Sequence, residues 1–89
     1  MHGDPDHVEE LAHSLRRAAE RAADQGRGIR DVARGVDWTG AAADAFRSCM
    51  AGRAAACDTA RDDLVAAAWA CEQHADAVRD ALRWVGVPA

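Results

Sequence analysis

The chain of 89 residues lacks features that whole classes of protein require. It contains no lysine and no tyrosine, one phenylalanine and two prolines. No apolar run approaches the ~20 residues of a transmembrane helix, and no basic patch interleaved with aromatic residues points to nucleic-acid binding. The sequence therefore predicts no stable membrane insertion and no nucleic-acid partner.

The first residues also lack the apolar core of a cleaved secretory leader, because acids interrupt residues 1–11. We therefore expect a protein that is cytoplasmic before export and that reaches the cell surface or medium by a leaderless route. The three cysteines (Cys49, Cys57 and Cys71) are an odd number, which argues against a closed set of intrachain disulfides. We interpret them as small buried apolar residues, with intermolecular bridges or a redox role as alternatives.

No catalytic or cofactor-binding arrangement is present in the sequence. There is no glycine-rich phosphate loop, and a thin helical protein offers no cleft for nucleophilic catalysis. Cys71 and His74 lie one helical turn apart and His7 could approach them, but this set supplies at most three metal ligands. We expect no enzyme activity, no cofactor and no metal site.

Alanine dominates what is present, with 23 residues. Alanine is the best helix former but buries little surface, so helices form easily while the core stays thin. We expect a single chain of this kind to bury too little apolar surface to be stable, and association with a second subunit would supply the rest. All 11 basic residues are arginine, which suggests a high-GC, actinobacterial type of genome.

The tripeptide Trp38-Thr39-Gly40 is the main break in a chain that otherwise has helical periodicity. An apolar stripe with a near seven-residue period runs on each side of it. We predict one all-α domain over residues 1–89, with helix 1 at about 5–35, a short turn at 36–40 and helix 2 at about 41–84. The two helices should form an antiparallel hairpin that dimerises into a four-helix bundle.

The sequence also predicts how the helices begin and which residues pack. Asp4 should cap helix 1 with Pro5 at its first position, and Asp37 or Thr39 should cap helix 2. Gly86 and Pro88 should end helix 2. The charged residues lie mainly away from the stripe and should form a solvated face. Trp69 stands off the stripe among alanines, as an interface anchor would. The predicted hairpin and dimer interface comprises Val8, Leu11, Leu15, Ile29, Val32, Phe46, Met50, Leu64, Trp69, Val78, Leu82 and Val85.

A length comparison adds one expectation. Folded about Trp38, helix 1 would reach only to about Cys71, because helix 2 is longer by ~13 residues at ~1.5 Å each. Val78, Leu82 and Val85 would then have no cover within one chain and would need a partner helix.

The segment from Asp37 to Arg47 resembles the WXG100 family of small helical hairpins exported by type VII (ESX) secretion systems. It has Trp-x-Gly at Trp38 and Gly40, then small residues, then Phe46 six residues after the glycine. The resemblance implies a homodimer or a heterodimer with a paired WXG100-like protein, packed as an antiparallel four-helix bundle. It also implies that Trp38 and Gly40 belong to the turn that the secretion ATPase engages.

One departure from the family pattern leaves alternatives open. WXG100 proteins usually carry a Tyr-x-x-x-Asp/Glu export element after helix 2, and this chain has no tyrosine. Either a partner carries that element, or the chain is a cytoplasmic chaperone or partner of a larger secreted toxin whose N-terminal domain is the second hairpin. A membrane-perturbing effector is a further alternative, although the polar faces lack the basic enrichment of interfacial helices.

Overall fold

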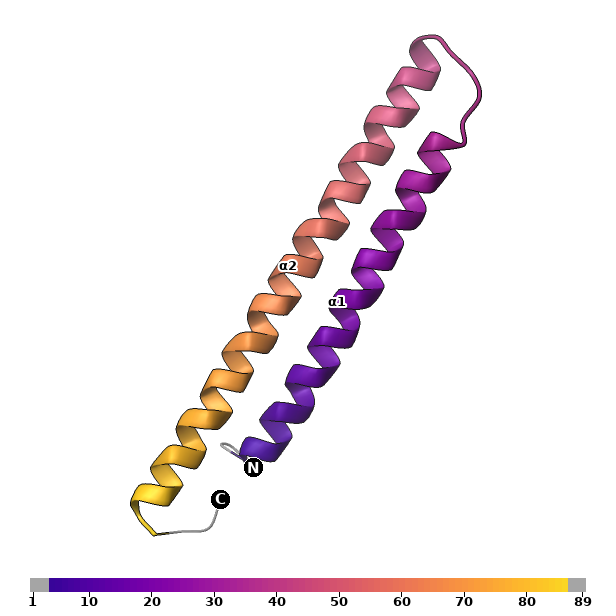
Figure 1. Ribbon diagram of the computed structural model, residues 1–89. Coiled ribbons are helices and arrows are strands. Elements are labelled where there is room, and N and C mark those ends of the chain that lie inside the picture. The colour runs from indigo at the N-terminus through magenta and orange to yellow at the C-terminus, as the bar shows by residue number, and fades with distance from the viewer. Residues whose placement is uncertain (1–3, 87–89) are drawn as a thin grey trace.

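The computed structural model describes residues 4–86 as two antiparallel helices, α1 (Pro5–Arg34) and α2 (Ala41–Trp84), packed side by side along their length (Figure 1). The described chain is a rod with principal extents of 69 × 17 × 14 Å. The predicted all-α two-helix hairpin is therefore confirmed.

The start of α1 follows from its sequence. The Asp4 carboxylate accepts a hydrogen bond from the backbone N–H of Asp6 at 3.0 Å, and Pro5 occupies the first turn. A side-chain acceptor satisfies one of the N–H groups that a helix leaves unpaired at its start, and proline loses nothing there because its missing N–H would be unpaired anyway. The prediction of an Asp4 cap is confirmed.

The seam between the helices is built from the smallest side chains. No side chain larger than alanine is fully buried among the described residues. In α1 the buried positions recur every seven residues, which keeps one side of the helix against its neighbour. An added Cβ at Gly26 would lie 3.3 Å from the Cys57 Cβ, so the helices approach each other closely at this glycine. The buried residues are Ala12, Ala19, Gly26, Ala43, Ala54, Ala68 and Ala75.

The connection between the helices lies where we predicted it, because α1 ends at Arg34 and α2 begins at Ala41, but it is not a compact turn. After Gly35, residues 36–39 run as an overhang beside the first turns of α2 before the chain reverses at the top of the rod (Figure 1). Neither Asp37 nor Thr39 caps α2. Gly40 is the N-cap residue, and α2 begins without a side-chain cap hydrogen bond.

This overhang corrects the prediction that α1 reaches only to about Cys71. Arg79 pairs with both Asp6 and Glu9, so α1 extends well past Cys71. Val78 and Leu82 are half-buried, whereas Val85 is exposed. The excess length of α2 lies mainly at the other end, where residues 35–40 cover it, because an extended chain spans about twice the length per residue of a helix.

Between residues 4 and 86, neither helix has the length and apolar character required to span a bilayer. Pro88, which we expected to help end helix 2, lies outside the described residues. The structure ends α2 at Trp84, followed by Gly86 with a φ of 76°.

Candidate interaction surfaces: an open apolar face and a tryptophan loop

One long edge of the hairpin carries a series of ion pairs between the helices, which we call the ladder edge. Arg16 binds Glu72 through two hydrogen bonds of 3.0 and 2.6 Å, a bidentate arrangement. Arg30 pairs with Asp58, and Arg79 pairs with Glu9. Residue numbers rise along α1 as their partners fall along α2, which fixes the antiparallel register.

These contacts favour the ionised carboxylates. The Arg16 guanidinium lowers the pKa of Glu72 by hydrogen bonding, and Arg79 does the same to Glu9. Arg30 holds the pKa of Asp58 below its ordinary value for the same reason. All of these groups remain partly exposed, so we assign the ladder edge to fixing register rather than to large stability.

Sequence reasoning missed the ladder edge by treating its charges as a solvated face. A signal was present, because Glu9, Arg16 and Arg30 are spaced by multiples of seven, as are Asp58, Glu72 and Arg79. This spacing places each set on one flank of its helix, and antiparallel helices bring equivalent flanks together.

The opposite edge is apolar and uncovered, and we call it the open face. Leu11 is 50% exposed and Val32 is 59% exposed, although both are large aliphatic residues. The remaining apolar members of the open face on α1 are half-buried and those on α2 are half-buried or exposed. The apolar residues of the open face are Val8, Leu11, Leu15, Ala18, Ala22, Ile29, Val32, Cys57, Ala60, Leu64, Ala67, Cys71 and Val78, and the polar residues Gln25, Arg53 and His74 interrupt them at the same seven-residue spacing.

The predicted interface residues therefore lie in four different environments. Five of them are half-buried beside the seam, so that each packs partly within the hairpin and partly forms the open face: Val8, Leu15, Ile29, Leu64 and Val78. Phe46, Met50 and Leu82 are half-buried towards the ends of α2. Leu11 and Val32 lie on the open face, and Val85 is 70% exposed beyond the last turn of α2.

Trp69 lies away from the open face. It is 59% exposed, and its position one residue after buried Ala68 turns it towards the side that carries Glu72. A shallow hollow on that side is lined by Arg16, Ala19, Glu20, Ala23, Arg61 and Val65. The structure does not bring Trp69 together with the other predicted interface residues.

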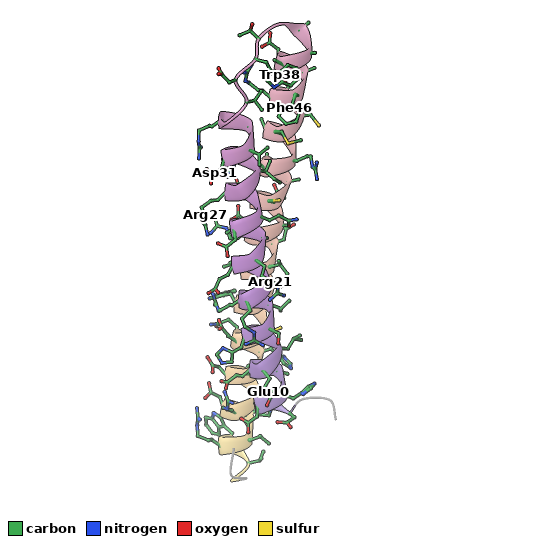
Figure 2. The ribbon with its side chains drawn as sticks, turned by 90° about the vertical axis from the view of Figure 1, so that its right-hand side faces the viewer. Glu10, Arg21, Arg27, Asp31, Trp38 and Phe46 are labelled. Carbon is green, nitrogen blue, oxygen red and sulfur yellow. The ribbon has the colours of Figure 1, made fainter. Side chains whose placement is uncertain are left out.

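The second candidate surface is the loop that carries Trp38. Arg47 holds this loop against α2 by donating hydrogen bonds to the carbonyl oxygens of Val36 at 3.2 Å and Trp38 at 2.7 Å. The Trp38 ring lies 6.1 Å from the Phe46 ring, centroid to centroid, and the two side chains lie together at the tip (Figure 2). Trp38 nevertheless stays 46% exposed, so it is fixed in position while one side remains available.

Gly40 is required by the backbone and not by close packing. Its φ of 107° and ψ of 179° lie in a region that is essentially restricted to glycine. An added Cβ there would meet no atom within 4 Å. Gly40 therefore permits the reversal of the chain and is not needed for close packing of α2 against α1.

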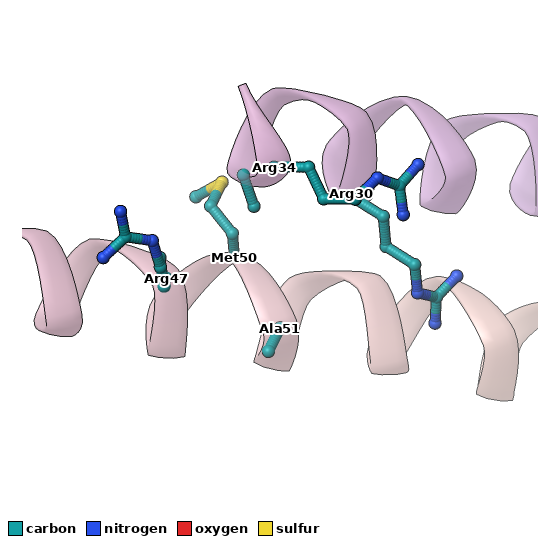
Figure 3. Close-up of a pocket in the computed structure, with 6 residues that line it drawn as sticks. Arg30, Arg34, Arg47, Met50 and Ala51 are labelled. Atoms are coloured by element: carbon teal, nitrogen blue, oxygen red, sulfur yellow. The ribbon is translucent and has the colours of Figure 1, made fainter. Parts of the chain in front are cut away.

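A hollow of about 330 Å³ lies below the loop, between the end of α1 and the start of α2. It contains three arginines, and Figure 3 shows Met50 between the side chain of Arg47 and those of Arg30 and Arg34. Each guanidinium already has a partner: Asp58 for Arg30, Asp31 for Arg34, and the loop carbonyls for Arg47. The hollow is therefore part of the support for the loop and is not an anion site.

The cysteines and histidines form no further site. All three cysteines are free; Cys49 is exposed, which contradicts our expectation of burial, whereas Cys57 and Cys71 are half-buried. Within residues 4–86 no group of three or more His, Cys, Asp or Glu side chains is placed to hold a metal ion.

These features define a class of protein: an alanine-seamed helical hairpin that displays an apolar flank and a fixed tryptophan loop. Residues 1–84 match a family model described as "Putative T7SS secretion signal domain", where T7SS is the type VII secretion system. The chain therefore belongs to this family of type VII secretion signal domains, and the match indicates no catalytic family. Searches of curated proteins and of solved structures gave no match.

Proposed function

We propose that the chain is a non-enzymatic interaction module that is exported together with a second helical hairpin. The observation that supports this proposal most directly is the open face. Leu11 and Val32 on it are at least half exposed, and the seam of the hairpin fully buries no described side chain larger than alanine. A solvent-exposed apolar patch of this length is typical of a protein interface. A second hairpin would cover it and complete a four-helix bundle.

We further propose that the Trp38 loop is the part that the secretion ATPase contacts. Three features support this role: Trp38 is held by Arg47 and Phe46, it is 46% exposed, and Gly40 fixes the chain reversal beside it. A pre-formed aromatic anchor loses little conformational entropy on binding, which favours a specific contact. The resemblance of this segment to the WXG100 proteins points the same way.

A second candidate function is that of a cytoplasmic partner for a larger secreted toxin, whose N-terminal domain would be the second hairpin. The absence of tyrosine favours it, because the export element typical of WXG100 proteins needs one. In either case the chain would act in the cytoplasm first, and leaderless export to the cell surface or medium would follow for the complex.

An export assay tests the proposal. The native chain should appear in the medium of cells with a functional secretion ATPase and stay in the cell without it. Trp38→Ala should reduce the exported fraction at least tenfold while leaving the cellular amount unchanged. Trp69→Ala is the matched control, because it removes a similarly exposed tryptophan from another part of the hairpin. Equal export of the two variants would contradict the assignment of the loop.

Export that depends on co-expression of a toxin, with the chain itself retained, would favour the second candidate. Leakage of liposomes at micromolar protein would instead support the membrane-perturbing alternative.

A further inference from the structure

The series of ion pairs on the ladder edge is interrupted at one level. The pairs use every seventh residue of α1 from Glu9 to Arg30, except that Ala23 stands where the third would be. On α2 the corresponding position holds Val65, seven residues from each of the flanking acids. The two apolar side chains fill less space than an arginine and a glutamate, and a hollow of about 260 Å³ opens at this level.

The charged groups at the hollow leave one carboxylate without a partner. Arg16 and Arg61 line it, but Glu72 binds the first through two hydrogen bonds and Asp62 pairs with the second at 3.0 Å. Glu20 also lines the hollow, and its carboxylate forms no ion pair or hydrogen bond with another residue between positions 4 and 86. The hollow therefore offers no unpaired cation to an anion, whereas a positively charged group would meet a free carboxylate.

The neighbouring arginines do not supply that positive charge. Arg17 donates a hydrogen bond to the Ser14 hydroxyl at 3.1 Å. Arg21 follows Glu20 directly in sequence, but it is turned about 100° away around α1. The other arginines along this edge have acidic partners within the described chain: Arg27 with Asp24, Arg30 with Asp58, Arg34 with Asp31, Arg79 with Asp6 and Glu9, and Arg83 with Asp80.

Trp69 adds an aromatic surface at the edge of the hollow. It lies one turn after Val65 on α2, and a helical side chain covers the turn before its own Cα. Glu20 lies one turn after Arg16, and Trp69 lies one turn before Glu72, so this ion pair sets Glu20 and Trp69 at nearly the same level of the rod. Because Trp69 is 59% exposed, its ring is available to a group that enters the hollow.

We propose that this hollow binds an arginine or lysine side chain of a partner protein. The apolar stem of such a side chain would pack on Ala23 and Val65, while its charged head would lie between the Glu20 carboxylate and the Trp69 ring. Both contacts are favourable, the first as a charge-assisted hydrogen bond and the second as a cation–π interaction. The proposal goes beyond the proposed function, because the site lies on the edge opposite to the open face and does not involve Trp38. A second partner can therefore bind while the open face is covered.

The surroundings of the hollow favour a protein over other macromolecules. Ala66 and Ala70 are exposed beside Trp69, and such short side chains allow the backbone of a partner to approach closely. A nucleic acid or an anionic lipid surface would bring negative charge to Glu20 and would be repelled.

A binding measurement on the full chain tests the site, with the capped peptide acetyl-Ala-Arg-Ala-amide as the probe. The three tryptophan indole N–H signals are followed by nuclear magnetic resonance, and Trp69→Phe assigns one of them. The Trp69 signal should shift saturably with a dissociation constant of about 1–10 mM, and the signals of Trp38 and Trp84 should change much less. The peptide with glutamine in place of arginine should bind at least about fivefold more weakly, because it lacks the charge.

Two variants separate the site from general attraction to an acidic protein. Glu20→Gln should weaken binding of the probe about fivefold, whereas Glu10→Gln removes the same charge from an exposed position elsewhere on α1 and should leave binding unchanged. Ala23→Leu should fill the hollow and abolish the saturable shift, and circular dichroism verifies that the helices remain.

The outcomes decide this proposal separately from the proposed function. Equal weakening by Glu20→Gln and Glu10→Gln, equal shifts of all three tryptophans, or full binding by a folded Ala23→Leu variant would each overturn the site. Trp69→Ala should lose the probe and keep its export, so a failure of this site leaves the roles of Trp38 and of the open face unaffected.

Discussion

The two long edges of this hairpin are made by the same helices and yet have opposite chemistry. On the ladder edge, arginines of one helix meet acids of the other and leave few charges unpaired between the helices. On the open face, Leu11 and Val32 remain exposed, and no other residue between positions 4 and 86 covers them. The ladder edge fixes the register within the hairpin, and the open face is left for association. Alanine side chains alone specify the register of two helices only weakly, so the ion pairs of the ladder edge are needed to fix it.

The largest effect is expected from placing charge on the open face. Leu11→Asp combined with Val32→Asp should weaken association by about 3 kcal/mol, or on the order of 100-fold, because the covering partner would bury two unpaired carboxylates. Light scattering over a concentration series measures the change. Ala55→Asp with Ala66→Asp adds the same charge at exposed positions away from the open face and should have little effect. Equal weakening by both pairs would show that net charge, and not the face, controls association.

An intermediate effect is expected at the seam between the two edges. Gly26→Leu should lower the free energy of unfolding by about 2 kcal/mol, because its Cβ would already press on the Cys57 Cβ at 3.3 Å. Gly28→Ala, two residues along, should raise stability by up to ~1 kcal/mol, since no atom lies within 4 Å of the new methyl group. Urea denaturation followed by circular dichroism compares them. A loss in both variants would show that α1 needs flexibility here and not close approach.

The smallest effect is expected on the ladder edge and depends on pH. Arg16 lowers the pKa of Glu72 below its ordinary value of 4.5, so the ion pair stabilises the folded state fully above that pH. Its contribution is lost as pH falls from about 4.5 through the lowered pKa. Glu72→Gln should therefore melt at a slightly lower temperature than the native chain at pH 7.

The difference between Glu72→Gln and the native chain should shrink below pH 4.5. Glu20→Gln, at an exposed position without an ion pair to a described residue, provides the comparison. A difference that is independent of pH would mean that Glu72 acts through packing of its side chain and not through its charge.

The local sequence was sufficient to predict where the two helices begin and end. The seven-residue apolar period predicted two long helices, Asp4 and Pro5 predicted the start of α1, and Trp38-Thr39-Gly40 predicted where the chain reverses. These features depend on neighbouring residues only, which is why they could be read without the fold. The resemblance to exported hairpins likewise came from one contiguous segment, and the family match now supports its coarser part, a type VII secretion signal domain.

The errors arose where distant parts of the chain meet. We expected Asp37 or Thr39 to cap α2, but the loop runs along α2 and Arg47 holds the carbonyls of Val36 and Trp38. That overhang carries α1 down to Arg79, which the comparison of helix lengths could not anticipate. The charges between the helices were taken for a solvated face because their partners lie up to 73 residues away in sequence.

The sequence by itself determined that this protein is a pair of alanine-rich helices with one apolar stripe on each and too few large side chains for a deep core. Only the tertiary structure decided that the stripes do not face each other directly. Backbones approach most closely over their smallest residues, so the seam centres on Ala12, Ala19 and Gly26 and moves the larger Leu11 and Val32 to one side. Periodicity fixes the angle of a residue on its own helix, whereas packing decides which angle faces the neighbouring helix and which faces water.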